Sequence, residues 1–137
     1  MAETGIACFE DLLLAARSQP EPQRLLFVFT VAELPEDSTP EERRRFAEGA
    51  GGALVPLMCV DKAPEELGTF AALAEESRAM GRDWSVVFAA GLAGRGGRAP
   101  TSEESRAPLQ RMVDSIKVGS HAAFIAFDRE GEPVLFE

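Results

Sequence analysis

A glycine-rich segment contains the residues of this chain that are best suited to bind an anion. Gly94, Gly96 and Gly97 alternate with two arginines, Arg95 and Arg98. Small residues let backbone amides approach a phosphate or carboxylate, and guanidinium groups bind such anions through paired hydrogen bonds. The segment lies between a predicted strand and a predicted helix, where many phosphate sites are built. It therefore predicts a site for a small anionic ligand, either a phosphate or nucleotide or a carboxylate, at Gly94, Arg95, Gly96, Gly97 and Arg98.

The same segment has two other interpretations. Gly94, Gly96 and Ala99 match the G-x-G-x-x-[GA] pattern of dinucleotide sites. Pro100 interrupts the start of the following helix, and Asp128 lies farther on than the roughly 20 residues expected for a ribose contact. No Gly-Lys-Ser/Thr triplet of a P-loop follows. We rank the interpretations of this segment in the order of a solvated loop, an anion contact by the two arginines, and a dinucleotide site.

The thiol of Cys59 is the second candidate for chemistry. It lies near the end of an apolar run and precedes a predicted helix that starts at Pro64, a setting that can lower a thiol pKa. A cysteine inside such a run is more often a small buried hydrophobe, and His121 is the only imidazole that could serve as its base. We therefore expect Cys59 in the core, with a reactive thiol as the alternative. For His121 itself we expect a solvent-exposed or capping role.

No catalytic set emerges from the other residues. The chain lacks a G-x-S-x-G elbow, and Cys8 and Cys59 lie too far apart for a CxxC motif. With a single histidine, the usual spacings of a zinc site are also absent. We expect no catalytic residues, metal or cofactor. The acidic residues are expected to be solvated, with a surface for a basic partner as the alternative: Glu33, Glu36, Asp37, Glu41 and Glu42.

Length and charge limit the classes of function. A chain of 137 residues with 45% hydrophobic residues fits one globular domain spanning residues 1–137. With 14 Lys plus Arg against 23 Asp plus Glu, the formal charge is −9, which opposes binding to nucleic acid or to an anionic membrane. No apolar run approaches the roughly 20 residues of a membrane-spanning helix, and the first residues are not those of a basic signal peptide. We therefore expect a cytoplasmic protein.

Helical and strand-like segments alternate along the chain. Apolar spacing and capping pairs predict helices over 8–18, 39–46, 64–81 and 101–119. Apolar runs predict strands over 25–31, 53–60, 84–90, 122–127 and 133–136. The order αβαβαβαββ predicts an α/β (or α+β) domain with a mixed, mostly parallel sheet of about five strands and a C-terminal β-hairpin.

Several residues fix details of these elements. Thr39 with Glu42, and Thr101 with Glu104, are predicted capping boxes. Pro56 lacks an N–H, so its strand is predicted to be bulged or to lie at an edge of the sheet. Apolar stripes identify the sheet-facing sides of three helices: Phe9, Leu12, Leu13 and Ala16; Leu67, Phe70, Ala71 and Ala74; and Leu109, Met112, Val113 and Ile116.

Four stretches, residues 20–29, 51–62, 94–97 and 108–113, resemble a family of small proteobacterial proteins of unknown function over nearly the whole chain. Some members carry the label ribonucleotide reductase alpha subunit. That catalytic subunit is a large radical enzyme with several cysteines, whereas this chain has two cysteines in 137 residues, so the resemblance implies a family and not that reaction.

A second resemblance is to the N-terminal domain of the enhanced serine sensitivity (SseB-type) proteins. It is carried by Val55-Pro56-Leu57 before a helix and by the turn from Gly131 to Pro133. This resemblance implies an architecture of helices on a sheet and assigns no catalytic residue.

The leading hypothesis for function is a non-catalytic interaction or regulatory domain, self-associating as a homo-oligomer or binding a protein partner. It is based on the lack of a catalytic set and on the apolar segment 134–136. The alternative is a small-anion-binding protein that uses the Gly94–Arg98 loop. A third hypothesis is a thiol enzyme that uses Cys59.

Overall fold

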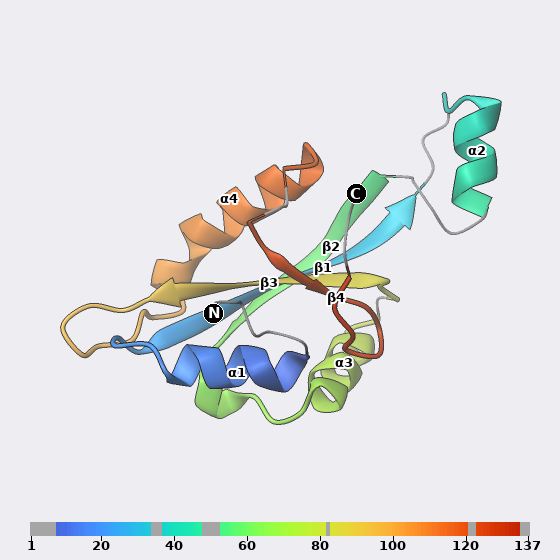
Figure 1. Ribbon diagram of the computed structural model, residues 1–137. Helices are drawn as coiled ribbons and strands as arrows, with labels where there is room; N and C mark the ends of the chain where they lie inside the picture. Colours follow the sequence, from blue (N-terminus) through green and yellow to red (C-terminus); the bar gives the residue numbers. More distant parts are fainter. Residues whose placement is uncertain (1–7, 34–36, 48–52, 82, 121–122, 135–137) are drawn as a thin grey trace, which may run out of the picture.

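A four-stranded sheet forms the centre of the molecule in the computed structural model (Figure 1), which describes residues 8–33, 37–47, 53–81, 83–120 and 123–134. Its strands are β1 (Gln23–Glu33), β2 (Ala53–Lys62), β3 (Val86–Ala93) and β4 (Ile125–Phe127). They lie in the order β2-β1-β3-β4, and every neighbouring pair is antiparallel.

The prediction of a mostly parallel sheet of about five strands is therefore wrong: the protein has an α+β fold with an antiparallel sheet. One source of the error is α2 (Pro40–Ala47), the helix between β1 and β2. A crossover helix must bury an apolar stripe on the sheet. The sequence of α2 is PEERRRFA, its described side chains are exposed, and Figure 1 shows it projecting away from the sheet. The chain therefore returns directly alongside β1.

Helices cover both faces of the sheet (Figure 1). Helices α1 (Phe9–Arg17) and α3 (Phe70–Ala79) lie on one face, and α4 (Arg106–Lys117) lies on the other. Strand β1 is buried on both sides, as predicted, because its alternate side chains enter two separate cores. The first core contains Leu25, Phe27 and Phe29, and the second contains Leu26 and Val28.

Most local predictions are confirmed. The predicted face of α1 is buried, at Phe9, Leu12, Leu13 and Ala16. Both capping boxes form: the amides of Thr39 and Thr101 donate to the carboxylates of Glu42 and Glu104 at 2.8 Å. β2 is an edge strand, and its register with β1 shifts next to Pro56.

Several element boundaries differ from the prediction, most clearly at two elements. The helix predicted from Pro64 is a short 3-10 turn, η1 (Pro64–Glu66), followed by α3, because the Thr69 hydroxyl caps a new start by accepting from the Ala72 amide. Ala71 is consequently exposed. β3 is displaced along the chain and includes Gly91, which was predicted to lie in the loop.

After β4 the chain turns back, as predicted for a hairpin. The described part of the second arm, residues 133 and 134, pairs with β4 but is too short to form a strand. Gly131 has a φ of 85°, which allows the turn. Phe127 pairs with Pro133 in an isolated bridge, and the Val134 amide donates to the Ala126 carbonyl at 2.9 Å. The rest of the predicted second arm, residues 135 and 136, lies outside the described residues.

Candidate functional site

The predicted anion-binding loop is a tight β-hairpin turn. The amides of Arg95 and Arg98 donate to each other's carbonyl oxygens at 3.0 Å. Between them, Gly96 and Gly97 have φ values of 58° and 80°. Positive φ at both central residues is the pattern of a type I′ turn, in which glycine is favoured because it has no Cβ. The turn geometry therefore explains this pair of glycines without a ligand.

Contacts with residues 21 and 22 hold this turn in place. The Gly94 amide donates to the Pro22 carbonyl at 2.8 Å, and the Gly97 amide donates to the Glu21 carboxylate at 2.8 Å. A Cβ on Gly94 would collide with the carbonyl oxygens of Arg98 and Pro22. Four amides of the loop, those of residues 94, 95, 97 and 98, thus donate within the protein. A ligand would have to be bound mainly by the two guanidinium groups.

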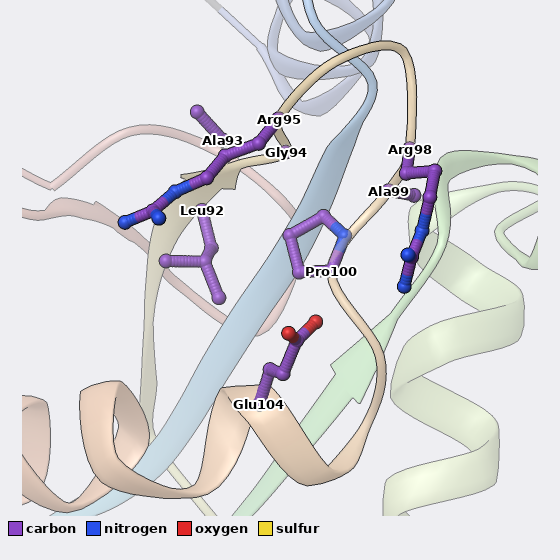
Figure 2. Close-up of a pocket in the computed structure, with 8 residues that line it drawn as sticks. All are labelled: Leu92, Ala93, Gly94, Arg95, Arg98, Ala99, Pro100 and Glu104. Atoms are coloured by element: carbon purple, nitrogen blue, oxygen red, sulfur yellow. The ribbon is translucent and has the colours of Figure 1, made fainter.

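A pocket of about 420 Å³ lies beside the turn (Figure 2). It is lined by residues 92–95 and 98–100 and by Glu104, which belongs to the short turn η2 (Glu103–Ser105) before α4. The lining combines the apolar side chains of Leu92 and Pro100 with three charged ones. In Figure 2 the side chains of Arg95 and Arg98 lie on opposite sides of Pro100, and the carboxylate of Glu104 lies between them.

Arg95 and Arg98 are exposed, and neither forms an ion pair within 4.0 Å with a carboxylate of the described residues. The ion pairs within 4.0 Å among the described residues are made by basic residues other than these two, namely Arg24, Lys62 and Arg129. Arg95 and Arg98 still act on Glu104 through space. The pKa of Glu104 is lowered mainly by the hydrogen bond from the Thr101 amide, and further by the Thr101 hydroxyl and by the charges of the two arginines. Glu104 is therefore a carboxylate at neutral pH.

Cys59 lies on the edge strand β2, and its side chain is exposed. The expectation of a buried core cysteine is wrong, because no further strand covers β2 among the described residues. The pKa of the thiol is raised, first by desolvation and second by the Asp61 carboxylate. This direction is opposite to the one that a reactive thiol needs. His121, the base considered for it, lies outside the described residues.

The remaining candidates have structural roles or lie on the surface. Glu33, Asp37, Glu41 and Glu42 are exposed, as expected of a solvated stretch, and Glu36 lies outside the described residues. Asp128 accepts from the amides of residues 130 and 132 in its own turn. The described residues contain no group of three or more potential metal ligands. Within the same residues, no helix combines the length and apolar character needed to cross a membrane.

Sequence reasoning missed two carboxylates of this region. Glu104 was identified as a capping residue, but its position beside Arg95 and Arg98 depends on how α4 is placed against the end of β3. Glu21 gave no signal, because its partner Gly97 lies 76 positions away in the sequence. No protein-family model, curated protein or solved structure matches this chain.

Proposed function

We propose that the protein is a non-catalytic binding domain for a small anionic ligand. The observation that carries this proposal is the pocket beside the turn, where the guanidinium groups of Arg95 and Arg98 are free of close ion pairs with the described carboxylates. Guanidinium groups bind carboxylates and phosphates through paired hydrogen bonds. In a chain with a net charge of −9, these two arginines give an anion a local point of attraction.

The lining supports binding more than catalysis. Among the described residues, its lining contains no serine, threonine, cysteine or histidine, and so no hydroxyl or thiol nucleophile and no imidazole base. Glu104 supplies a carboxylate to the lining, and its lowered pKa makes it a poor proton donor at neutral pH. A cytoplasmic location belongs to the same proposal, and the free thiols of Cys8 and Cys59 are compatible with a reducing compartment.

Thermal denaturation with added anions tests the proposal. Phosphate, sulfate and short carboxylates are compared for the wild type and for the Arg95→Ala/Arg98→Ala variant. A ligand present at 100 times its dissociation constant adds about 2.7 kcal/mol to the free energy of unfolding, which is easily measured. We expect at least one anion to stabilise the wild type and to lose that effect in the variant.

A matched control is Arg44→Ala/Arg45→Ala, which removes the same charge from the exposed helix α2. This variant should retain the stabilisation by the anion. Equal loss in both double variants would indicate a general charge effect and would contradict a site at the turn. Stabilisation that persists in Arg95→Ala/Arg98→Ala would place the anion elsewhere.

A second candidate function is self-association through β2, in line with an interaction domain. β2 is a ten-residue edge strand, and its half-buried apolar residues include Val55, Leu57 and Val60. Edge strands can pair with a second chain through their outward backbone groups. Pro56 and the register shift beside it oppose such pairing in the middle of the strand, which makes this candidate the weaker of the two.

The oligomeric state at micromolar concentration tests this second candidate. Cys59→Lys introduces a positive charge at an exposed position of β2, and Ala123→Lys introduces the same charge at an exposed position just before β4, which forms the opposite edge of the sheet. A wild-type dimer that dissociates with Cys59→Lys and persists with Ala123→Lys would support self-association through β2. A monomeric wild type would contradict it.

A further inference from the structure

The pocket combines two positive groups with one negative group, and their arrangement is informative about the ligand. In Figure 2 the guanidinium groups of Arg95 and Arg98 point to different sides of the pocket, and the Glu104 carboxylate lies between them. The two positive groups therefore do not converge on one point. Each can therefore bind an anionic group of its own, so a ligand with two anionic groups can engage both arginines.

The central carboxylate disfavours a bare anion and favours a hydrogen-bond donor. An ionised carboxylate offers about four acceptor positions and no donor. Hydrogen bonds from Thr101 occupy part of that capacity, on the side of the capping box. A negative group placed next to Glu104 would be repelled, whereas a hydroxyl or ammonium group would be attracted.

From this arrangement we infer that the pocket selects a short dicarboxylic acid with a hydroxyl or ammonium group next to one of its carboxylates. Arg95 and Arg98 each bind one carboxylate, and Glu104 accepts the hydrogen bond from the donor group. The volume of about 420 Å³ lies within the range of small-molecule sites, roughly 300–1,000 Å³. This inference rests on the proposed function, because it specifies the ligand of the same site.

Calorimetric titration with three four-carbon probes tests the inference. Succinate has two carboxylates and no donor, L-malate adds a hydroxyl group, and L-aspartate adds an ammonium group. A hydrogen bond to a charged group is strong enough to change affinity by about tenfold. We expect malate, aspartate or both to bind at least about tenfold more tightly than succinate. Tighter binding of aspartate would identify the donor as ammonium, and tighter binding of malate would identify it as hydroxyl.

The Glu104→Gln variant tests the role of the central carboxylate. Glutamine keeps the acceptor oxygen of a capping box and removes the charge. We expect succinate to bind this variant more tightly than it binds the wild type, and the preference for the donor-bearing probe to fall below about threefold. A preference that survives Glu104→Gln would overturn the assignment of Glu104.

The outcomes separate this inference from the proposed function. Equal binding of the three probes to the wild type overturns the ligand class but leaves an anion site that depends on Arg95 and Arg98. Binding of phosphate, with no binding of the three probes, leads to the same conclusion. If no carboxylate, phosphate or sulfate binds, both the ligand class and the proposed function are wrong.

Discussion

The carboxylate of Glu21 accepts a hydrogen bond of 2.8 Å from the backbone N–H of Gly97, which lies 76 positions later in the chain. This bond joins the residues before β1 to the tip of the hairpin turn after β3. The neighbouring bond from the Gly94 amide to the Pro22 carbonyl, also 2.8 Å long, holds the base of the same turn. Together they fix the backbone from which the side chains of Arg95 and Arg98 extend.

Glu21→Ala should loosen this turn with little effect on global stability. The bond is exposed, so its loss should reduce the free energy of unfolding by less than about 1 kcal/mol. Hydrogen exchange measured by NMR should show faster exchange of the Gly97 amide. Glu41→Ala, in the exposed helix α2, should leave that exchange rate unchanged. Unaltered protection of Gly97 in Glu21→Ala would mean that the bond does not hold the turn.

Gly94→Ala should be strongly destabilising. Its Cβ would overlap the backbone oxygens of Arg98 and Pro22, which cannot move without breaking the turn. We expect a loss of about 1–3 kcal/mol in urea denaturation, as for other overpacking substitutions. Gly68→Ala is the control, because a Cβ at that exposed loop position meets nothing within 4 Å. Similar losses in both variants would argue against the close approach at Gly94.

Ser77→Ala should expose the cost of an unsatisfied buried donor. The indole N–H of Trp84, a residue only 1% exposed, donates to the Ser77 hydroxyl at 2.6 Å, and that hydroxyl donates to the Ala74 carbonyl. Removal of the hydroxyl leaves the indole N–H without this acceptor, at a cost of about 1–3 kcal/mol. The measurement is the free energy of unfolding in urea.

A double-mutant cycle with Trp84→Phe separates this bond from packing effects. In the Trp84→Phe background there is no indole N–H to satisfy, so Ser77→Ala should cost less than it does alone. Additive losses would show that the two side chains are not coupled.

Glu104 should make the stability of the protein depend on pH in the acidic range. Its pKa in the folded protein is lowered from the ordinary value of 4.5, chiefly by the hydrogen bond from the Thr101 amide. A lowered pKa means that the ionised form stabilises the folded state, so this contribution is present above pH 4.5 and is lost as the pH falls through the lower, folded-state pKa. The free energy of unfolding, measured from pH 7 to pH 3, should therefore decline less for Glu104→Gln than for the wild type.

Thr101→Ala removes the hydroxyl of the capping box and should raise the pKa of Glu104 toward its ordinary value. An NMR titration of the Glu104 carboxyl group measures this directly. A wild-type pKa at or above 4.5 would contradict the predicted shift.

Cys59 should react slowly with alkylating reagents although it is exposed. Desolvation, and to a lesser extent the Asp61 carboxylate, raise its pKa above the ordinary value of 9.0, which lowers the thiolate fraction at neutral pH. In a Cys8→Ser background, iodoacetamide at pH 7.5 should modify the native protein more slowly than the urea-unfolded chain. Asp61→Asn should accelerate the native reaction. Faster alkylation of the native protein than of the unfolded chain would contradict this prediction and support a reactive thiol.

The elements of this fold could be located in the sequence because their signals are local. The spacing of Phe9, Leu12, Leu13 and Ala16 predicts which face of α1 is buried, since a helix brings such residues together whatever lies beyond it. The missing N–H of Pro56 likewise predicts an edge or a bulge, and the structure has both.

Whether neighbouring strands run parallel or antiparallel could not be predicted from such local signals. Helix α2 lies between β1 and β2, and alternation alone treats it as a crossover. Its composition contained a neglected signal: PEERRRFA has no apolar stripe with which to cover a sheet. The antiparallel return of β2 follows from that absence of a buried face.

The turn that carries the candidate site could be predicted from the sequence, whereas its long-range contacts could not. The sequence by itself determined that two arginines flank a Gly-Gly turn between a strand and a capped helix, because turn geometry and capping depend on residues within a few positions. Only the tertiary structure decided that Glu21 occupies the Gly97 amide and that Glu104 lies between Arg95 and Arg98. These contacts depend on how β1, β3 and α4 pack, and through-space electrostatics depends on that packing and not on distance along the chain.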